Sequence, residues 1–244
     1  MNNTNITVTT EDGGYTAQCA TSVKNYKVIT YTATSKLPET TSTFSGGLHT
    51  NAFSGTSGQR LTMVSHTFED GVGTVTLNGD IAKFGDFAFY SATTLASIDI
   101  PDSVTSIGGH AFNGCSGLKT IEIPDSVTSI GTSAFTYCTG LTSIEIPDSV
   151  TSIGEYAFTQ CSGLTSVTIG SGVKSIRNSV FYNCRSLTSI VSNAMIAPTI
   201  TYSTFGFVKT NGTLYVPSGS SGYDTWMQNS SYYLGLYNWT KVEQ

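Results

Sequence analysis

Apolar residues recur along the middle of the chain at a fixed spacing of 23 positions. The segments that begin at Leu95, Leu118 and Leu141 read LASIDIPDSVTSIG, LKTIEIPDSVTSIG and LTSIEIPDSVTSIG. Such self-similarity indicates a repeat architecture, in which each unit packs mainly on its neighbours. We therefore predict five full units over 72–186, followed by a degenerate sixth that begins at Leu187 and ends near Val216.

Alternation within one unit predicts a β-strand. In the unit that begins at Leu118, Ile121 and Ile123 point to one side while Thr120 and Glu122 point to the other. Pro124 follows and ends the strand, because it has no N–H to donate to a neighbouring strand.

The rest of the unit is expected to lead the chain back to the start of the next strand. VTSIG at 127–131 is expected to form a second short extended segment, and SAFTYC at 133–138 is expected to form a helical turn that places Phe135 in the centre. One unit cannot bury its apolar columns alone, but stacked units can, with parallel strands about 4.8 Å apart. The predicted fold is a mostly-β repeat solenoid, a right-handed superhelix.

The two ends differ from the repeats. Residues 1–71 lack the period and alternate threonine with apolar residues, so we expect a β-rich N-terminal cap over the open end of the first coil. The loop at 40–58 is expected to be mobile. The solenoid is predicted over 72–216. Residues 217–244 are rich in aromatic residues and predict a C-terminal cap, with YDTWMQ helical and YNWTKVE a closing strand.

Composition limits the partners. Only 11% of the residues are charged and the net charge is −5, which gives no electrostatic attraction to nucleic acid or to acidic lipid. No apolar run reaches the length of a membrane span. The first residues, MNNTNITVTTEDGG, are not a signal peptide. We expect that a signal was trimmed, or that the protein never used one.

Cysteine gives a structural signal. Cys115, Cys138, Cys161 and Cys184 occupy one column, while Cys19 lies outside it. Zinc sites usually take ligands that are close in sequence, such as C-x-x-C pairs, so we expect neither metal nor cofactor. The spacing favours a column of small buried side chains. Disulfides between neighbouring coils remain the alternative.

Catalytic motifs are missing from the sequence. The chain contains no HExxH, no G-x-S-x-G and no P-loop. A Ser-His-Asp triad assembled from distant residues is the alternative that the sequence leaves open. We expect a protein without enzymatic activity.

The pattern LxxIxIPxSVTSIGxxAFxxCxxL resembles the BspA-like leucine-rich repeat family over 72–186, and more loosely through the C-terminal end. The resemblance implies a bacterial surface or secreted protein used in adhesion, with no catalytic residues. Arg177 departs from the pattern, because Gly85, Gly108, Gly131 and Gly154 hold the same position in the other units. We therefore expect glycine not to be sterically required there.

Strand alternation also predicts a candidate binding face. It places Ser97, Thr120 and Ser143 in one outward column, continued by Ser166 and Ser189. The neighbouring outward column holds Asp99, Glu122 and Glu145, followed by Thr168 and Val191. Asp102, Asp125 and Asp148 form a second acidic file just after the strands, for which turn chemistry is the alternative explanation.

Stacked carboxylates repel one another, so the acidic column suggests a ligand. A recent repeat duplication would explain it equally well. We hypothesise that it meets a cationic protein patch or a Ca²⁺-bridged ligand. The favoured function is extracellular or cell-surface adhesion to a protein or matrix ligand. Two alternatives are a carbohydrate-binding module that uses the C-terminal aromatic residues, and a phage virion or tail component.

Overall fold

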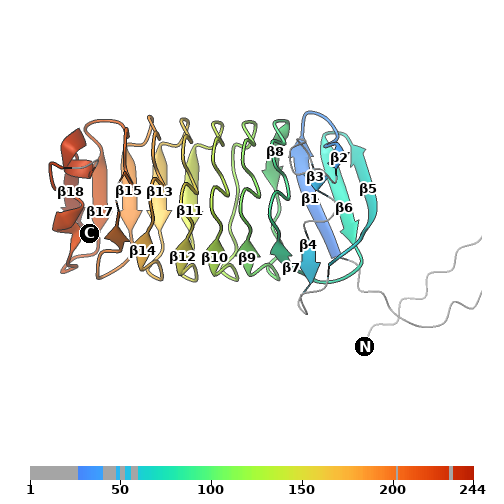
Figure 1. Ribbon diagram of the computed structural model, residues 1–244, viewed down its shortest axis with the longest axis horizontal. Helices are drawn as coiled ribbons and strands as arrows, with labels where there is room; N and C mark the ends of the chain where they lie inside the picture. Colours follow the sequence, from blue (N-terminus) through green and yellow to red (C-terminus); the bar gives the residue numbers. More distant parts are fainter. Residues whose placement is uncertain (1–26, 41–47, 50–52, 56–59, 202, 231–232) are drawn as a thin grey trace, which may run out of the picture.

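The computed structural model shows short coils stacked into one elongated solenoid (Figure 1). The structure describes residues 27–40, 48–49, 53–55, 60–201, 203–230 and 233–244. Cys19 and most of the loop at 40–58 lie outside the described residues. Each coil has three sides, which we call the strand face, the second face and the turn face.

The strand face is a parallel sheet over the later part of the stack, in which each coil from residue 141 onward contributes one strand. Its strands are β11 (Ser143–Ile146), β13 (Ser166–Ile169), β15 (Ser189–Ser192), β17 (Thr213–Val216) and β18 (Thr240–Glu243). The register places Ile144 beside Val167 and Glu145 beside Thr168. Buried and outward side chains alternate along β11, β13, β15 and β17, which confirms the predicted strand pattern, and β18 is the predicted closing strand at the C-terminus.

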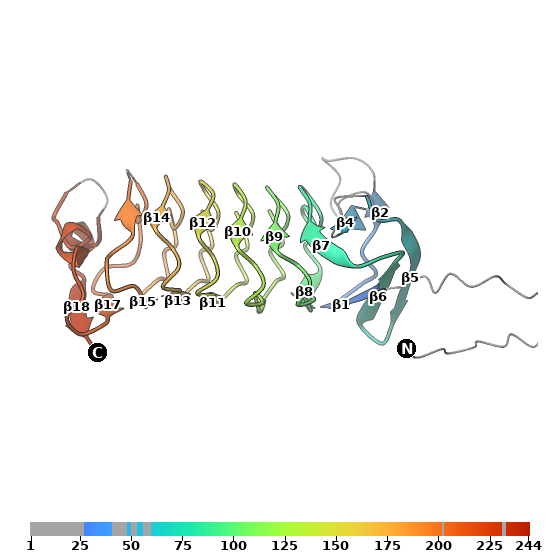
Figure 2. The ribbon, with the colours of Figure 1, turned by 90° about the horizontal axis from the view of Figure 1, so that it is seen from below.

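The second face is a sheet of shorter strands on the opposite edge of the stack (Figure 2). It contains β4 (Phe53–Gly55), β7 (Ile81–Phe84), β9 (Ser106–Ile107), β10 (Ser129–Ile130), β12 (Ser152–Ile153), β14 (Ser175–Ile176) and β16 (Thr199–Ile200). Apart from β4, which pairs antiparallel with β7, these strands are parallel. They are the second extended segments that the sequence predicts.

The turn face, formed by residues 86–93, 109–116, 132–139, 155–162, 178–185 and 203–209, consists of tight turns. Two residues in each turn have a positive φ, for example Ser133 at 55° and Tyr137 at 62°. These left-handed residues interrupt any helical path, so the expected helical turn is replaced by consecutive turns. The inward direction of Phe135 is as predicted, since this residue is fully buried.

The core is a continuous stack of phenylalanine rings. Neighbouring ring centroids lie 5.2–5.9 Å apart and the ring planes differ by 1–10°. The stack consists of Phe89, Phe112, Phe135, Phe158, Phe181 and Phe205. Since every ring contacts rings from other coils, burial of this apolar area depends on stacking rather than on any single unit.

Glycine is required where the coils approach most closely. A β-carbon at Gly131 would lie 2.5 Å from the carbonyl carbon of Gly108, and one at Gly154 would lie 2.4 Å from the nitrogen of Thr132. The expectation drawn from Arg177, that glycine is sterically dispensable here, is therefore wrong for these coils. The one-letter pattern does not reveal how closely two backbones approach.

The N-terminal cap is an antiparallel sheet in the order β5 (Met63–Glu69), β6 (Val72–Leu77), β1 (Lys27–Ala33) and β8 (Leu95–Ile98). Strand β1 lies between β6 and β8 and covers the open edge of the strand face. A short pair, β2 (Glu39–Thr40) and β3 (Leu48–His49), lies beside it.

The first predicted unit is divided between cap and stack. Its strand β6 pairs with β1 and β5, whereas β7 pairs in parallel with β9. Val72 was expected in an inward column, but it is 44% exposed because it begins a strand of the cap. The expected boundary between 71 and 72 thus falls between β5 and β6, which are hydrogen-bonded to each other. We propose that the first coil is shared, with β6 in the cap and β7 in the stack.

The C-terminal end is closed by aromatic rings and by β18. Two short 3-10 helices, η1 (Tyr223–Thr225) and η2 (Leu234–Tyr237), precede the last strand. Trp226 and Trp239 are buried, and their indole N–H groups donate to the carbonyls of Pro198 and Lys209. Within the described residues, no helix has the length and apolar character needed to cross a lipid bilayer.

Candidate functional site

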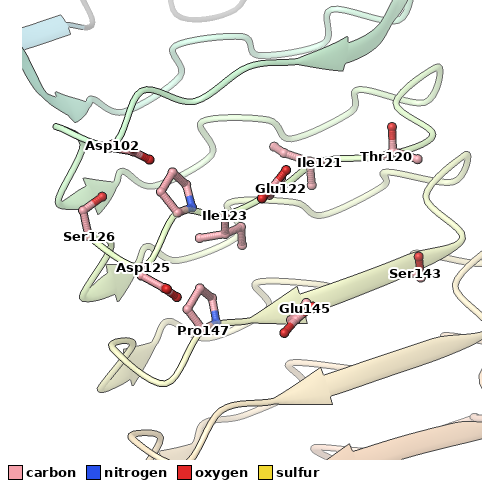
Figure 3. Close-up of a pocket in the computed structure, with 11 residues that line it drawn as sticks. Asp102, Thr120, Ile121, Glu122, Ile123, Asp125, Ser126, Ser143, Glu145 and Pro147 are labelled. Atoms are coloured by element: carbon pink, nitrogen blue, oxygen red, sulfur yellow. The ribbon is translucent and has the colours of Figure 1, made fainter.

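A groove of about 840 Å³ lies on the strand face, mainly over the third and fourth coils. It is found between β8 and β11, where the coil that contains residues 118–123 forms no assigned strand. Figure 3 shows Thr120 and Ser143 near the start of the two coils, Glu122 and Glu145 midway along, and Asp125 at the turn. The groove is open to solvent along the face that the sequence predicts for binding.

The backbone ladder is interrupted beneath this groove. Lys119 N–H donates to the carbonyl of Ala96 at 3.0 Å, but within the described residues no backbone hydrogen bond joins residues 120–123 to another coil. The next coils are fully paired, from Ser143 beside Ser166 to Ile146 beside Ile169. A tight ladder would hold like charges about 4.8 Å apart, so the interruption relieves repulsion in the acidic column.

Four carboxylates line the groove together with apolar side chains. The acidic residues are Asp102, Glu122, Asp125 and Glu145. Across the described part of the chain, none of the four forms an ion pair with lysine, arginine or histidine. Pro124, which is half-buried, and Ile121, Ile123 and Pro147, which are buried, complete much of the lining, so the carboxylates lie over an apolar floor that is itself largely covered.

The structure brings together part of the predicted site. Thr120, Glu122, Ser143 and Glu145 line the groove. Ser97 and Asp99 do not, because β1 occupies the other side of β8.

Ser97 and Asp99 instead contact β1 of the N-terminal cap. The Ser97 hydroxyl lies 2.7 Å from that of Thr32, and the backbone N–H of Asp99 donates to Thr30 at 3.0 Å. The Asp99 side chain remains exposed, in the coil before Glu122.

The second acidic file divides into two kinds of residue. All three aspartates lie in the tight turn that the alternative explanation expects, which Val104, Val127 and Val150 close by donating their N–H groups to the carbonyls of Pro101, Pro124 and Pro147. The Asp148 carboxylate also accepts the backbone N–H of Ser171 in the next coil at 2.6 Å. No comparable side-chain bond is described for Asp102 or Asp125, and both line the groove. Turn chemistry therefore accounts for all three positions, and two of the three carboxylates also face the groove.

The outward column changes character towards the C-terminus. Its register continues from Glu145 through Thr168, Val191 and Tyr215 to Val242. Sequence reasoning missed the last two members, because the spacing lengthens from 23 to 24 and then to 27 residues, which breaks the simple period. The strand face is thus acidic over its first coils and apolar over its last ones.

The described residues give no support to the two other binding modes that the sequence suggested, a Ca²⁺-bridged ligand and a sugar bound by the C-terminal aromatic residues. Among the described residues, no three His, Cys, Asp or Glu side chains converge in a way that could hold a metal ion. This geometry gives no support to the Ca²⁺-bridged form of the hypothesis. Tyr223 and Trp226, central to the predicted aromatic cap, are each 1% exposed and so cannot stack on a sugar.

The cysteine column is buried and unpaired. Cys115, Cys138, Cys161 and Cys184 are free thiols with 0% exposure. Each thiol donates to the carbonyl of a core phenylalanine, as Cys115 does to Phe89 at 3.0 Å. Burial raises the pKa of Cys115 and of Cys161 to about 12. These properties confirm the structural interpretation and exclude the disulfide alternative for these four residues.

Several solved structures of bacterial proteins are similar to this chain. A leucine-rich repeat protein of Treponema pallidum is 28% identical over 52% of this chain and 70% of its own, with a TM-score of 0.42. A leucine-rich cell surface protein of Faecalibacterium prausnitzii is 30% identical over 65% of this chain and 46% of its own, with a TM-score of 0.45. The pneumococcal vaccine antigen PcpA is 20% identical over 67% of this chain and 39% of its own, with a TM-score of 0.48.

The chain thus spans less than half of the last two proteins. No curated protein gives a significant match. The profile of the BspA type leucine-rich repeat region matches residues 82–209 in six copies, which is more than half of the chain. The chain therefore belongs to the BspA-type leucine-rich repeat family.

Proposed function

We propose that this chain is a non-enzymatic binding module of a bacterial surface or secreted protein, and that its strand-face groove receives a basic, extended segment of a partner protein. The observation that carries the proposal is the set of four carboxylates, without cationic partners in the described chain, around an apolar groove. Membership of the BspA-type family, whose proteins are often found at the cell surface, supports the location.

The chemistry of the groove matches lysine and arginine side chains. Their aliphatic stems can pack on the half-buried Pro124, while the charged heads remain near the solvent edge. Glu122 and Glu145 would accept charge-assisted hydrogen bonds from those heads.

The apolar half of the strand face extends the same surface. Val191 and Tyr215 are half-buried and Val242 is 37% exposed, all in the column that begins with the acidic residues. A partner segment that is basic at one end and apolar at the other would therefore match the whole face. Apolar contact would provide affinity, while the carboxylates would speed association and fix direction.

The test compares two charge-matched double variants. Glu122→Gln with Glu145→Gln removes two charges from the groove, whereas Glu69→Gln with Glu155→Gln removes two charges elsewhere. The probe is a synthetic peptide of alternating lysine and valine, with a glutamate–valine peptide as its counterpart. We expect the groove variant to bind the lysine peptide at least tenfold more weakly in calorimetry, and the control variant to bind as the parent does.

Salt dependence provides a second measurement. Screening acts over about 10 Å at 0.1 M ionic strength, so parent affinity should fall steeply with added salt and the groove variant should lose most of this dependence. Equal affinity of parent and groove variant for the lysine peptide, or equal binding of the two peptides by the parent, would contradict the proposal.

A further inference from the structure

Two tyrosines on the turn face are exposed without an evident role in folding. Tyr137, on the third coil, is 47% exposed, and Tyr156, on the fourth coil, is 44% exposed. Both project from the tight turns, away from the phenylalanine stack. This side of the molecule is distinct from the groove on the strand face.

Their backbone conformation makes these tyrosines unexpected. Tyr137 has a φ of 62° and Tyr156 a φ of 61°, in the left-handed region that bulky L-residues rarely adopt. Every turn has left-handed residues at these two positions, and the side chains there vary. Other coils place Ser91, Gly114, Gln160, Asn183 and Phe207 at the position of Tyr137, and Phe87, His110, Ser133 and Ser179 at that of Tyr156. A tyrosine here strains the backbone more than glycine or asparagine would, and its ring is largely open to water. Unfavourable residues of this kind concentrate where binding requires them.

The turns hold the two residues rigidly. Tyr137 N–H donates to the carbonyl of Thr159 at 3.0 Å, and Tyr156 N–H donates to that of Asn178 at 3.0 Å. The Thr136 hydroxyl donates to the carbonyl of Tyr156 at 2.6 Å. Coils on both sides therefore fix each backbone before any ligand arrives, which lowers the entropic cost of binding.

Both rings are open to a ligand. Phe87 and His110 stack on each other at 4.9 Å, and Tyr182 contacts Phe207 at 5.3 Å. Within the described residues, neither Tyr137 nor Tyr156 contacts another aromatic ring. The open rings are thus a local feature of the third and fourth coils.

The immediate neighbours are uncharged hydrogen-bonding groups. The Gln160 amide donates through Nε2 to the Tyr137 hydroxyl at 3.0 Å, which orients the amide and leaves its oxygen free to accept. Ser133 precedes Tyr156 in the same column of the stack, and Asn183 follows Gln160. Flat apolar rings therefore alternate with fixed amides and hydroxyls.

We propose that Tyr137, Tyr156 and Gln160 form a carbohydrate-binding site for a neutral polysaccharide. A pyranose ring presents an apolar face of C–H groups and an edge of hydroxyl groups, which match a tyrosine ring and an amide. Aromatic rings supply large rigid contact area with little loss of side-chain freedom. A protein anchor side chain would need a closed apolar pocket, and no pocket described here is lined by these tyrosines.

The test uses substitutions that relieve the strained backbone. Tyr137→Asn with Tyr156→Ser introduces residues typical of these turn positions, and Val64→Ser removes an equally exposed apolar side chain from β5 as the control. The probes are starch, xylan, mannan and mixed-linkage β-glucan in affinity electrophoresis, followed by calorimetry with a hexasaccharide of the one that retards the parent. We expect at least a tenfold loss of affinity in the double variant, with an unfolding midpoint equal to or above that of the parent.

Four outcomes would overturn the proposal. One is that none of the four polysaccharides retards the parent, and another is that the double variant binds as the parent does. The third is that the double variant unfolds at a lower temperature, which would make the rings structural. A pull-down in which the two substitutions abolish capture of a protein instead would also overturn it. Gln160→Ala should weaken glycan binding while leaving the unfolding midpoint unchanged.

Discussion

At the scale of single residues, the inward phenylalanines contribute most to stability. Phe135 is fully buried between Phe112 and Phe158, with centroid distances of 5.2 Å on both sides. Phe135→Ala should lower the free energy of unfolding by about 3–5 kcal/mol, because it leaves a cavity shared by three coils. Thr132→Ala, at an exposed position in the same coil, should cost under about 0.5 kcal/mol.

Chemical denaturation of both variants checks this difference. Matching denaturation midpoints for the two variants would contradict the assignment of inward and outward columns. The slope of the transition should stay close to that of the parent, since neither change alters how much surface unfolding exposes.

The thiol column makes a second prediction at this scale. The pKa of Cys115 and of Cys161 is raised to about 12 by burial, so the native thiols remain protonated and shielded at neutral pH. Titration with a thiol reagent at pH 8 should modify none of Cys115, Cys138, Cys161 and Cys184 in native protein. All four should react after denaturation without reductant, as mass mapping of labelled peptides can show. Labelling of any of them in the native state would contradict the buried column.

At the scale of elements, the N-terminal cap contains a buried network that responds to pH. The fully buried His66 side chain of β5 lies between Tyr31 of β1 and Glu39 of β2, with distances of 2.8 Å from Nε2 to the Tyr31 hydroxyl and 3.0 Å from Nδ1 to the Glu39 carboxylate. Neutral imidazole satisfies both partners when Nδ1–H donates to Glu39 and Nε2 accepts from Tyr31. Burial lowers the pKa of His66, and nearby Lys36 lowers it further, against the opposing effect of Glu39.

This network predicts that the cap loses stability in acid. Because the pKa of His66 is lower in the folded state than the ordinary value of about 6.5, its contribution is complete above that value. As pH falls below it, the unfolded chain takes up the proton more readily, so the folded state is destabilised. Amide exchange in β5 and β6 should quicken between pH 7 and pH 5, and much less so in His66→Gln. Equal acceleration in the variant would exclude His66 as the cause.

Elements built from local repeats were predictable, whereas those set by distant partners were not. The alternation around Ile144 identified β11 because neighbouring units repeat it. The same alternation in β6 fits a strand of the stack and a strand of the cap equally well. β6 belongs to the cap because β1 pairs antiparallel with it. The turns lack helix because Ser133 and Tyr137 are left-handed, a property that the period does not reveal.

The sequence predicted some of the residues of the candidate site, but neither the groove itself nor how far the binding face continues towards the C-terminus. Glu122 and Glu145 emerged from strand alternation, and the groove includes both. The interruption of the ladder at 120–123 depends on the spacing between coils, which the sequence does not reveal. Tyr215 and Val242 were missed because insertions before β17 and β18 break the 23-residue spacing.

At the scale of the whole molecule, the cap and the aromatic end leave the sides of the solenoid free for binding. Strand β1 covers one end and β18 forms the other, so both proposed sites lie on the long sides of the stack (Figures 1 and 2). Because each coil contacts mainly its neighbours, stability should accumulate coil by coil. A binding surface can then change in length without redesign of the core.

Deletion of one complete unit tests this modularity. Removal of residues 141–163 joins Gly140 to Leu164, the same kind of junction as Gly163 to Leu164 in the parent. It also brings Phe135 beside Phe181, so every buried column stays in register. The shortened protein should fold cooperatively, with lower stability and a length reduced by about 4.8 Å. Circular dichroism and small-angle scattering measure these properties. Removal of residues 141–152 alone serves as the control, because it merges the strand of one coil with the turn of another and should prevent folding. If both deletions unfold the protein, the coils do not act as interchangeable units.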